Sequence, residues 1–297
     1  MGISKSTIKL LEEVPLAPYS SWKIGGVARW LAEPTVSELP DLISWASQRD
    51  IPMYFLGRGS NVLIADKGLL GLVILTRKSM TELRREKEYI IADSGVFLPH
   101  LSQFAAREGF SGFEFLIGIP GTVGGALAMN AGLTVFRPRE MVSIVEDFDV
   151  VNPDGSLETL TLDDISVGYR QTDLLDGKRF ISRVRFRLKH EGNPEELRSN
   201  TLAHLAERKR KQPLDKPTAG STFKSPPGSR GAGWYIEQAG LKGFQIGEAK
   251  VSLMHANWIE NLGDATATDV QSLIEHIQVR VEERCHIKLE PEVIFLH

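Results

Sequence analysis

The chain has 297 residues, of which 42% are hydrophobic and 25% charged, which is ordinary for a soluble globular protein of two or three domains. Its formal net charge of −3 gives no support for a nucleic-acid partner. Cys285 is the single cysteine, which excludes a disulfide framework and a cysteine-based zinc site and fits a reducing compartment. The first residues have no apolar run ahead of a small-residue cleavage site, so we expect no signal peptide.

Helix and strand alternate in the first predicted unit, residues 1–77. Thr35 and Glu38 have the spacing of a capping box and precede apolar residues at helical intervals, so they predict a helix that ends before Asp50. Strand-like runs follow at 53–56, 62–65 and 71–75. A tight polar turn at 57–61 separates the first two of these runs. The alternation indicates an α/β or α+β layer.

A second unit is predicted over residues 78–190, and its polar, charged segment 78–88 links it to the first. A strand at 89–92 precedes a helix whose apolar face carries Leu98, Leu101, Phe104 and Ala105. Further strands are predicted at 144–151, 157–161 and 179–188. The uncharged stretch 115–136 is long enough to cross a bilayer, but its many glycines argue against a membrane helix.

A third unit follows the last of these strands. A helix is predicted from Pro194 to about Lys211, because an asparagine N-cap, a proline and two glutamates open it. A last helix is predicted to open at Thr268, with Gln271 completing a capping box. The chain ends in a predicted strand at 292–296.

Several standard signatures are absent from the chain. It contains no G-x-x-x-x-G-K-[ST], no G-x-G-x-x-G after a strand, no H-E-x-x-H and no G-x-S-x-G. The seven histidines have no metal-ligand spacing, so we expect no metal site. The basic run 208–211 could contact nucleic acid, but cations are favoured at the end of a helix in any case. We therefore expect no nucleic-acid partner.

Two glycine-rich loops are candidates for phosphate binding, at residues 57–61 and 118–125. Successive backbone N–H groups in such loops form concave anion sites, and a helix start after the second loop would add partial positive charge. A pyrophosphate is the natural guest. The alternative for either loop alone is an ordinary tight turn, but the two together, with Asn130 closing the second, favour a ligand cradle.

The third unit also carries candidate chemistry. Ser221 follows a glycine, and Lys224 lies three residues later. Arg170 lies in a predicted loop, and Glu290 and Glu292 lead into the last strand. Each has a simpler alternative: a hydrogen-bonded structural serine, a surface salt bridge for the arginine, and a surface charge for one of the carboxylates.

In their order along the chain, these motifs resemble those of the UDP-N-acetylenolpyruvoylglucosamine reductases of bacterial cell-wall synthesis. The resemblance covers nearly the whole chain. Its blocks lie at 19–26, 57–61, 118–125 with 130–132, 169–170, 211–213, 219–224, 240–243, 255–257 and 290–293. So many blocks in the family's order make an accidental match very improbable.

The resemblance implies an α+β fold. A two-domain FAD-binding module of the vanillyl-alcohol-oxidase (PCMH) type is expected to precede a C-terminal α+β substrate-binding domain. The implied boundaries are 1–77 and 78–190 for the two FAD-binding subdomains and 191–297 for the substrate-binding domain. Residues 171–220 are too few for the extra lid segment of the longer form, so the shorter subtype is implied.

The resemblance also implies a reaction and its participants. NADPH is expected to reduce non-covalently bound FAD, and UDP-N-acetylenolpyruvoylglucosamine then takes a hydride at C3 and a proton at C2 to give UDP-N-acetylmuramate. Ser221 matches the proton donor, and Arg170 and Glu292 match the other catalytic positions. The expected place of the reaction is the bacterial cytoplasm, without membrane insertion.

The binding residues carry over by the same matches. The cofactor positions are Gly57, Gly59, Ser60, Asn61, Ile119, Pro120, Gly121, Val123, Gly124, Gly125 and Asn130. The substrate positions are Tyr169, Lys211, Lys224 and Lys242, of which Lys211 and Lys242 are expected near the phosphates and uridine.

The chain departs from the family's pattern at a few positions. Ser225 replaces an asparagine, Glu248 replaces a glycine, and Val167 with Gly168 stands where an aromatic residue is usual. We expect these departures to change substrate contacts rather than the reaction. Two rival functions are a flavin oxidase of the same fold class and a nucleotide-sugar binding protein that has lost catalysis, and the matched catalytic residues argue against both.

Overall fold

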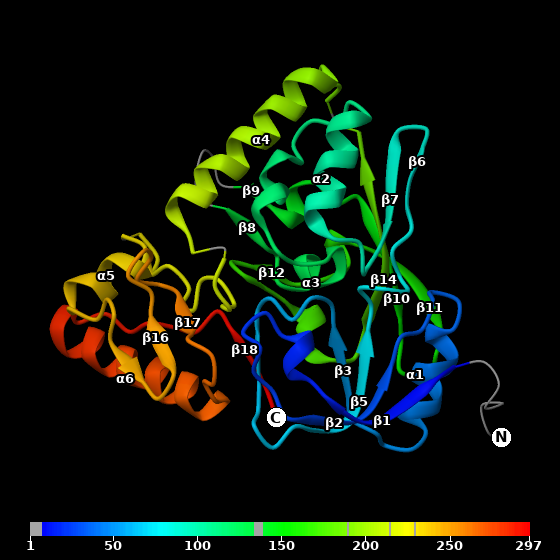
Figure 1. Ribbon diagram of the computed structural model, residues 1–297. Coiled ribbons are helices and arrows are strands. Elements are labelled where there is room, and N and C mark those ends of the chain that lie inside the picture. Colours follow the sequence, from blue (N-terminus) through cyan, green and yellow to red (C-terminus); the bar gives the residue numbers. More distant parts are fainter. Residues whose placement is uncertain (1–7, 134–138, 189, 214, 229) are drawn as a thin grey trace. The chain divides into compact units, whose positions relative to one another are not determined.

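The computed structural model describes residues 8–133, 139–188, 190–213, 215–228 and 230–297 (Figure 1). The chain forms two compact units, the first from residues 1–12, 30–58 and 70–207 and the second from residues 13–29, 59–69 and 208–297. The signal-peptide expectation concerns residues that lie mostly outside the described part. The end of the uncharged stretch 115–136 lies outside it as well.

The first sheet has the strand order β1-β2-β5-β3. Its strands are β1 (Leu10–Pro15), β2 (Val27–Ala32), β5 (Leu69–Leu75) and β3 (Met53–Leu56), and β3 and β5 are parallel. Helix α1 (Leu39–Ser47) buries one apolar face, as its spacing predicted. The helix begins at Leu39. Thr35 lies in a separate turn before the helix, and its N–H and hydroxyl both donate to the Glu38 carboxylate at 2.8 Å.

The second sheet is antiparallel throughout, with the order β11-β10-β14-β7-β6. Its strands are β11 (Leu157–Thr161), β10 (Asp147–Val151), β14 (Phe180–Arg187), β7 (Tyr89–Asp93) and β6 (Leu83–Glu86). The segment 78–88, predicted as a link, therefore contains edge strand β6. Its charged side chains suit an exposed edge, since they discourage pairing with another chain.

Two helices pack against this second sheet, α2 (Leu98–Arg107) and α3 (Val123–Ala128) (Figure 1). The 3-10 helix η2 (Glu114–Gly118) connects them and adds Phe115 and Leu116 to the same buried cluster. The described part of the uncharged stretch thus folds into short helices at a core. Within the described residues, none of the helices combines the length and apolar character needed to cross a membrane.

Short elements complete the first unit. Two small hairpins pair β8 (Gly132–Leu133) with β9 (Arg139–Glu140) and β12 (Val167–Gly168) with β13 (Gln171–Thr172). The 3-10 helices are η3 (Met141–Ser143), η4 (Leu162–Asp164) and η5 (Asp173–Asp176).

Helix α4 (Pro194–Lys211) starts where predicted, because the Asn193 side chain accepts from the N–H of Glu195 at 2.9 Å.

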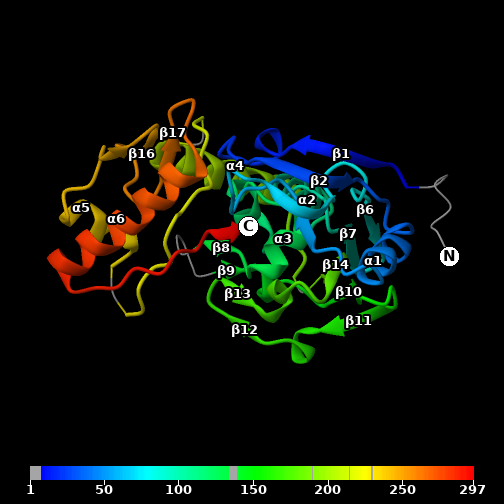
Figure 2. The same cartoon turned by 90° about the horizontal axis from the view of Figure 1, so that it is seen from below.

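The second unit is built around helix α6 (Ala267–Cys285), which lies along a small sheet in both views (Figures 1 and 2). The sheet strands are β15 (Gln245–Ile246), β16 (Ala249–Val251) and β17 (Ile259–Asn261). The unit also contains η1 (Ala17–Tyr19), α5 (Ala232–Gln238) and the parallel pair β4 (Val62–Ile64) with β18 (Ile294–Leu296). Buried Trp22 joins its core, and the indole N–H donates to Ile259 O at 2.8 Å.

The start of α6 differs from the prediction. Thr266 is the N-cap and Asp269 completes the capping box, two residues earlier than the predicted pair Thr268 and Gln271. The reason is that the Thr268 hydroxyl and N–H both donate to the Asp66 carboxylate, at 2.8 and 3.0 Å, so Thr268 cannot serve as the cap.

Candidate functional site

The first glycine loop contacts the residue that precedes α3. A Cβ added at Gly57 would lie 2.3 Å from Oγ1 of Thr122, so only glycine allows this approach. Arg58 follows in the loop, and its guanidinium lies 4.4 Å from the ring centroid of Phe97, whose backbone bridges Thr122. Burial and the nearby positive charge of Arg77 lower the pKa of Arg58. The loop thus places a partly desolvated cation over the Phe97 ring.

The rest of this loop is held by backbone contacts within the second unit. Gly59 has a left-handed φ of +60° and is buried, and a Cβ there would lie 2.3 Å from Tyr19 O. The Asn61 side chain donates to Glu292 O at 3.0 Å. Among the described residues, no acceptor is placed for the backbone N–H groups of Gly59 and Ser60. Two successive donors therefore remain available for a ligand.

The second glycine loop has one position that packing does not explain. The N–H of Gly124 donates to Ser94 O at 2.8 Å, and a Cβ on Gly124 would lie 2.7 Å from Cβ of Ser94, so this glycine is required by close packing. Gly125 is exposed, and the nearest atom to its added Cβ would be Oγ1 of Thr122 at 3.6 Å, an ordinary contact. A glycine within a helix costs about 1 kcal/mol relative to alanine.

The N–H of Gly125 is also without an acceptor in the part of the chain that the structure describes. The N–H of Val123 is already bonded to Val96 O at 2.9 Å, so the six-residue helix α3 offers fewer free donors than the sequence suggested. Ile119, Pro120 and Gly121 form the more exposed entry to the loop. Each glycine loop by itself thus offers free N–H groups of the kind that bind phosphate, Gly59 and Ser60 in the first loop and Gly125 in the second.

Arg170 lies at the tip of the β12–β13 hairpin, and its side chain is buried. Nη2 donates to Gly132 O at 2.6 Å, and Nη1 donates to Asn130 O at 3.3 Å. Nη1 also lies 3.4 Å from Oε1 of Glu140. The Tyr169 ring covers the guanidinium, with the ring centroid 4.8 Å from Cζ. This enclosed arrangement differs from the surface salt bridge that was the alternative for this residue.

Asn130 and Glu140 complete the surroundings of Arg170. Asn130 is fully buried, and its Nδ2 donates to Oε2 of Glu140 and to Gly168 O, both at 3.0 Å. Its side chain is therefore used within the protein. The sequence interpretation did not single out Glu140, because no local motif links it to partners 10 and 30 residues away.

Ser221 lies on a segment that pairs with the residues around Glu292. The Glu292 N–H donates to Thr222 O at 2.8 Å, and the Lys224 N–H donates to Glu290 O at 2.9 Å. The structure thus brings together three of the predicted residues, Ser221, Lys224 and Glu292. The hydroxyl of Ser221, half-buried, has no hydrogen-bond partner among the described residues. Arg170 belongs to the other unit.

Positive charge gathers around His255 in the second unit. Burial, Lys242 and Arg208 together lower the pKa of His255, burial having the largest effect. Burial lowers the pKa of Arg208 to about 10. Lys242 pairs with Glu237 at 3.1 Å, and Lys211 is exposed at the end of α4. A desolvated cation, Arg208, together with the positive charge of Lys242 near the same histidine, favours an anionic ligand.

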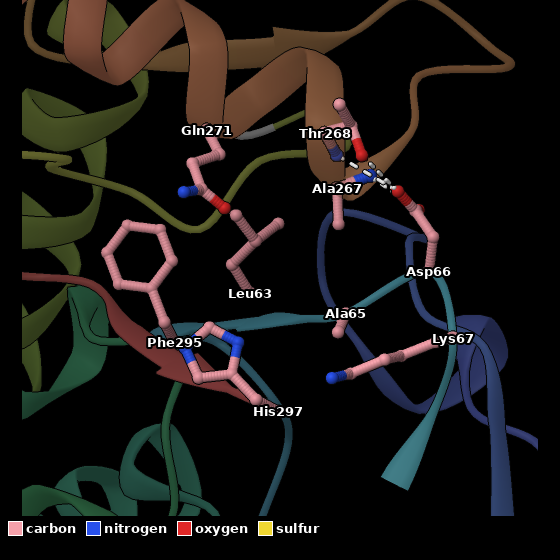
Figure 3. Close-up of a pocket in the computed structure, with 9 residues that line it drawn as sticks. All are labelled: Leu63, Ala65, Asp66, Lys67, Ala267, Thr268, Gln271, Phe295 and His297. Atoms are coloured by element: carbon pink, nitrogen blue, oxygen red, sulfur yellow. Dashed lines mark hydrogen bonds between the residues drawn. The ribbon is translucent and has the colours of Figure 1, made fainter.

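A separate pocket of about 300 Å³ lies at the start of α6 (Figure 3). Its polar lining comes from Asp66, Lys67, Thr268, Gln271 and His297. None of the sequence-predicted site residues lines it. The Asp66 carboxylate accepts from the N–H groups of Ala267 and Thr268 at 2.7 and 3.0 Å, so the protein itself fills the donor positions at this helix start.

Family profiles, protein relatives and a solved structure all point to one kind of protein. Residues 212–296 match the family profile described as UDP-N-acetylenolpyruvoylglucosamine reductase, C-terminal domain, and residues 31–161 match an FAD binding domain. A UDP-N-acetylenolpyruvoylglucosamine reductase from Synechococcus sp. (strain WH7803) is 41% identical over 96% of this chain and 92% of its own length. One from Acaryochloris marina is 39% identical, over 99% of this chain and 95% of its own. The crystal structure of UDP-N-acetylenolpyruvylglucosamine reductase from Thermus caldophilus covers 98% of this chain and 99% of its own, with a TM-score of 0.80 and 36% identity.

Proposed function

The chain belongs to the UDP-N-acetylenolpyruvoylglucosamine reductase family, and from this premise we propose which of its residues carry the reaction. It is an FAD-dependent oxidoreductase of peptidoglycan precursor synthesis that uses NADPH. Its fold joins an FAD-binding module of the vanillyl-alcohol-oxidase type to the C-terminal domain of the family. Bound FAD supplies hydride transfer from NADPH to C3 of the enolpyruvyl group of the sugar nucleotide.

In this proposal each glycine loop contributes phosphate-binding N–H groups for FAD, Gly59 and Ser60 from the first loop and Gly125 from the second. Gly125 is the main support, because it is an exposed helical glycine that no contact among the described residues requires, and close approach of a ligand explains it. Gly57 and Gly124 contribute by letting the backbone pack closely, and Arg58 adds positive charge nearby. The other proposed cofactor positions are Asn61, Ile119, Pro120, Gly121, Val123 and Asn130.

Ser221 is the proposed proton donor to C2. A serine hydroxyl is a weak acid, so it must be held in place and assisted by its surroundings to act as a general acid. Its segment is held on both sides, by Asn257 on one and by the Glu292 backbone on the other. Because none of the described residues bonds the Ser221 hydroxyl, this hydroxyl is available to the substrate.

Arg170 and Glu292 are proposed to stabilise the charge that forms after hydride arrives at C3. That charge spreads onto the substrate carboxylate as an enolate, and a fixed cation or a protonated acid lowers the energy of this state. Arg170 is suited to this role because its guanidinium is already oriented by two backbone carbonyls, Gly132 O and Asn130 O.

Substrate binding is assigned to Tyr169, Lys211, Lys224 and Lys242. Lys242 lies in the positive field around His255 and Arg208, which suits the diphosphate of the nucleotide sugar. The ammonium of Lys224 is paired with Glu290, so it is shared with that carboxylate. Arg208 and His255 are additions to the residues predicted from the sequence.

Three further statements stay proposals. The division into subdomains 1–77 and 78–190 and a substrate-binding domain 191–297 follows from the family pattern, as does the shorter subtype without a lid segment. The bacterial cytoplasm is proposed as the site of action because NADPH and nucleotide sugars are intracellular metabolites.

The most direct test of the function is the visible spectrum of the purified protein under anaerobic conditions. NADPH should bleach the flavin absorbance, and UDP-N-acetylenolpyruvoylglucosamine should restore it. A colourless protein, or one reoxidised only by oxygen, would contradict the proposal.

A further inference from the structure

Glu140 makes contact with both polar side chains at the centre of the Arg170 network. Its Oε1 lies 3.4 Å from Nη1 of Arg170, and its Oε2 accepts a hydrogen bond at 3.0 Å from Nδ2 of Asn130. The side chain of Arg170 is 8% exposed and that of Glu140 is 34% exposed. One carboxylate therefore bonds a buried cation and a buried amide at the same time.

The two partners of Glu140 share an unusual backbone conformation. Asn130 has φ +42° and Arg170 has φ +57°, both in the left-handed region. This region costs a non-glycine residue about 1–2 kcal/mol. The two residues are also bonded to each other, since Nη1 of Arg170 donates to Asn130 O at 3.3 Å. Such strain persists where surrounding contacts fix it, and it is found preferentially at functional sites.

The charge balance gives Glu140 a specific part in this arrangement. A buried guanidinium needs both hydrogen bonds and a compensating charge. The carbonyls of Gly132 and Asn130 orient the Arg170 guanidinium without carrying charge. Glu140 supplies negative charge and, through Asn130, fixes the carbonyl to which Arg170 is bonded.

Other arginine–carboxylate pairs of the first unit differ from this one. Arg185 pairs with Asp149 at 2.7 Å and Arg183 with Asp93 at 3.0 Å, but both arginines lie within strand β14. Neither has a left-handed backbone. Those pairs join neighbouring strands of one sheet, whereas Glu140, on strand β9, contacts the turn of a different hairpin, β12–β13.

We propose that Glu140 is a positioning residue that holds Arg170 in the orientation required for the reduction of the enolpyruvyl substrate, acting through Arg170 and Asn130 without touching the substrate. The inference rests on the proposed role of Arg170. It predicts that Glu140 matters for the half-reaction in which the enolate forms and not for the reduction of FAD by NADPH.

The test compares Glu140→Gln with the unaltered holoenzyme by rapid mixing under anaerobic conditions. Glutamine keeps the size of the side chain, but it carries no charge and replaces one of the two acceptor oxygens, Oε1 toward Arg170 or Oε2 toward Asn130, by an NH2 group that cannot accept. FAD content and the rate of reduction by NADPH should stay unchanged. Reoxidation by UDP-N-acetylenolpyruvoylglucosamine should slow by roughly 10- to 100-fold, since a misplacement of about 1 Å can cost that much. The steady-state loss should lie in kcat more than in KM.

Glu146→Gln is the matched control, because Glu146 lies 3.6 Å from an arginine of the same unit, Arg187. It should leave both half-reactions unchanged. A normal rate of reoxidation in Glu140→Gln would overturn the proposal. Equal slowing of both half-reactions would overturn it too, since that result indicates general damage to the FAD-binding unit.

A double-mutant cycle with Arg170→Lys distinguishes the positioning role from the role of Arg170 itself. If Glu140 acts through Arg170, adding Glu140→Gln to Arg170→Lys should slow reoxidation by no more than about twofold. If the two substitutions slow reoxidation independently, so that their fold-reductions in rate multiply in the double variant, the proposal is overturned. If reduced Arg170→Lys is reoxidised at the normal rate, Arg170 takes no part in the reaction, and the catalytic role proposed for it is wrong. A slow Arg170→Lys with a normal Glu140→Gln would overturn the positioning role alone.

Discussion

The side chain of Asn257 bonds both backbone polar groups of Phe223: its Oδ1 accepts from the Phe223 N–H at 3.0 Å, and its Nδ2 donates to Phe223 O at 2.8 Å. Both residues are buried, so these bonds form away from water and leave neither backbone group unpaired. The Thr222 N–H also donates to Asn257 O at 2.8 Å. Ser221 therefore begins a segment whose next two residues are fixed by a single asparagine.

Ser221→Ala should separate the two half-reactions. Reduction by NADPH needs no proton at carbon, so its rate should be near normal. Reoxidation by the sugar nucleotide should slow by about 10²–10⁴-fold, the usual contribution of a general acid. Rapid-mixing absorbance measures each step on its own. Normal reoxidation in this variant would show that another group donates the proton, and Ser221→Cys should recover part of the loss because a thiol is more acidic.

Lys242→Met should raise the KM for the sugar nucleotide by about tenfold, because a charge-assisted hydrogen bond to phosphate contributes about 1.5–3 kcal/mol. Lys211→Met is expected to act in the same direction, and FAD content should be unchanged in both. Lys288→Met is the matched control, since Lys288 also pairs with one carboxylate, Glu282, at 3.5 Å. Steady-state kinetics at saturating NADPH measures the effect, and an unchanged KM in both test variants would place the diphosphate elsewhere.

His255 should make the protein less stable as the pH falls. Its pKa is lowered in the folded protein, so the unfolded chain takes up the proton first on acidification. The stabilising effect of the neutral ring is fully present above the unfolded pKa of about 6.5 and is lost as the pH falls below it. His255→Asn should therefore show a shallower loss of thermal stability between about pH 7.5 and 5.5. Identical slopes for both proteins would contradict this role.

Much of the fold could be predicted because its signals are local. The apolar spacing of Leu39, Leu42 and Ile43 and the proline opening of α4 each depend on a few neighbouring residues, and both helices form. The start of α6 was misplaced because Thr268 bonds Asp66, which lies about 200 residues away in the chain. Edge strand β6 was missed because it consists of one leucine followed by three charged residues, which gives no alternating apolar signal.

The candidate site was predictable only in part, because some of its contacts join residues that are distant in the sequence. The glycine loops and the Ser221 block are contiguous motifs, so the sequence pointed to them directly. The bonds of Glu140 connect residues from two hairpins and have no sequence spacing of their own. Sequence patterns also could not distinguish Gly124, required by Ser94, from Gly125, which has free space.

These two glycines provide the sharpest test of the FAD site. Gly125→Ala should leave the FAD-free protein as stable as before or more stable by up to about 1 kcal/mol, because alanine favours the helix. Its Cβ would meet the protein only at 3.6 Å, at Thr122 Oγ1. FAD affinity should fall by at least about tenfold, since the methyl group occupies the space where the diphosphate approaches the Gly125 N–H.

Gly124→Ala should behave in the opposite way. Its Cβ would lie 2.7 Å from Cβ of Ser94, so we expect a loss of roughly 1–3 kcal/mol from overpacking. The double variant Gly124→Ala with Ser94→Gly removes the clashing atom and should recover stability. Thermal unfolding of the FAD-free proteins and titration with FAD, followed by quenching of flavin fluorescence, measure the two effects separately. If Gly125→Ala binds FAD with unchanged affinity, the Gly125 N–H does not meet the diphosphate, and the cofactor must be held by other groups of these loops.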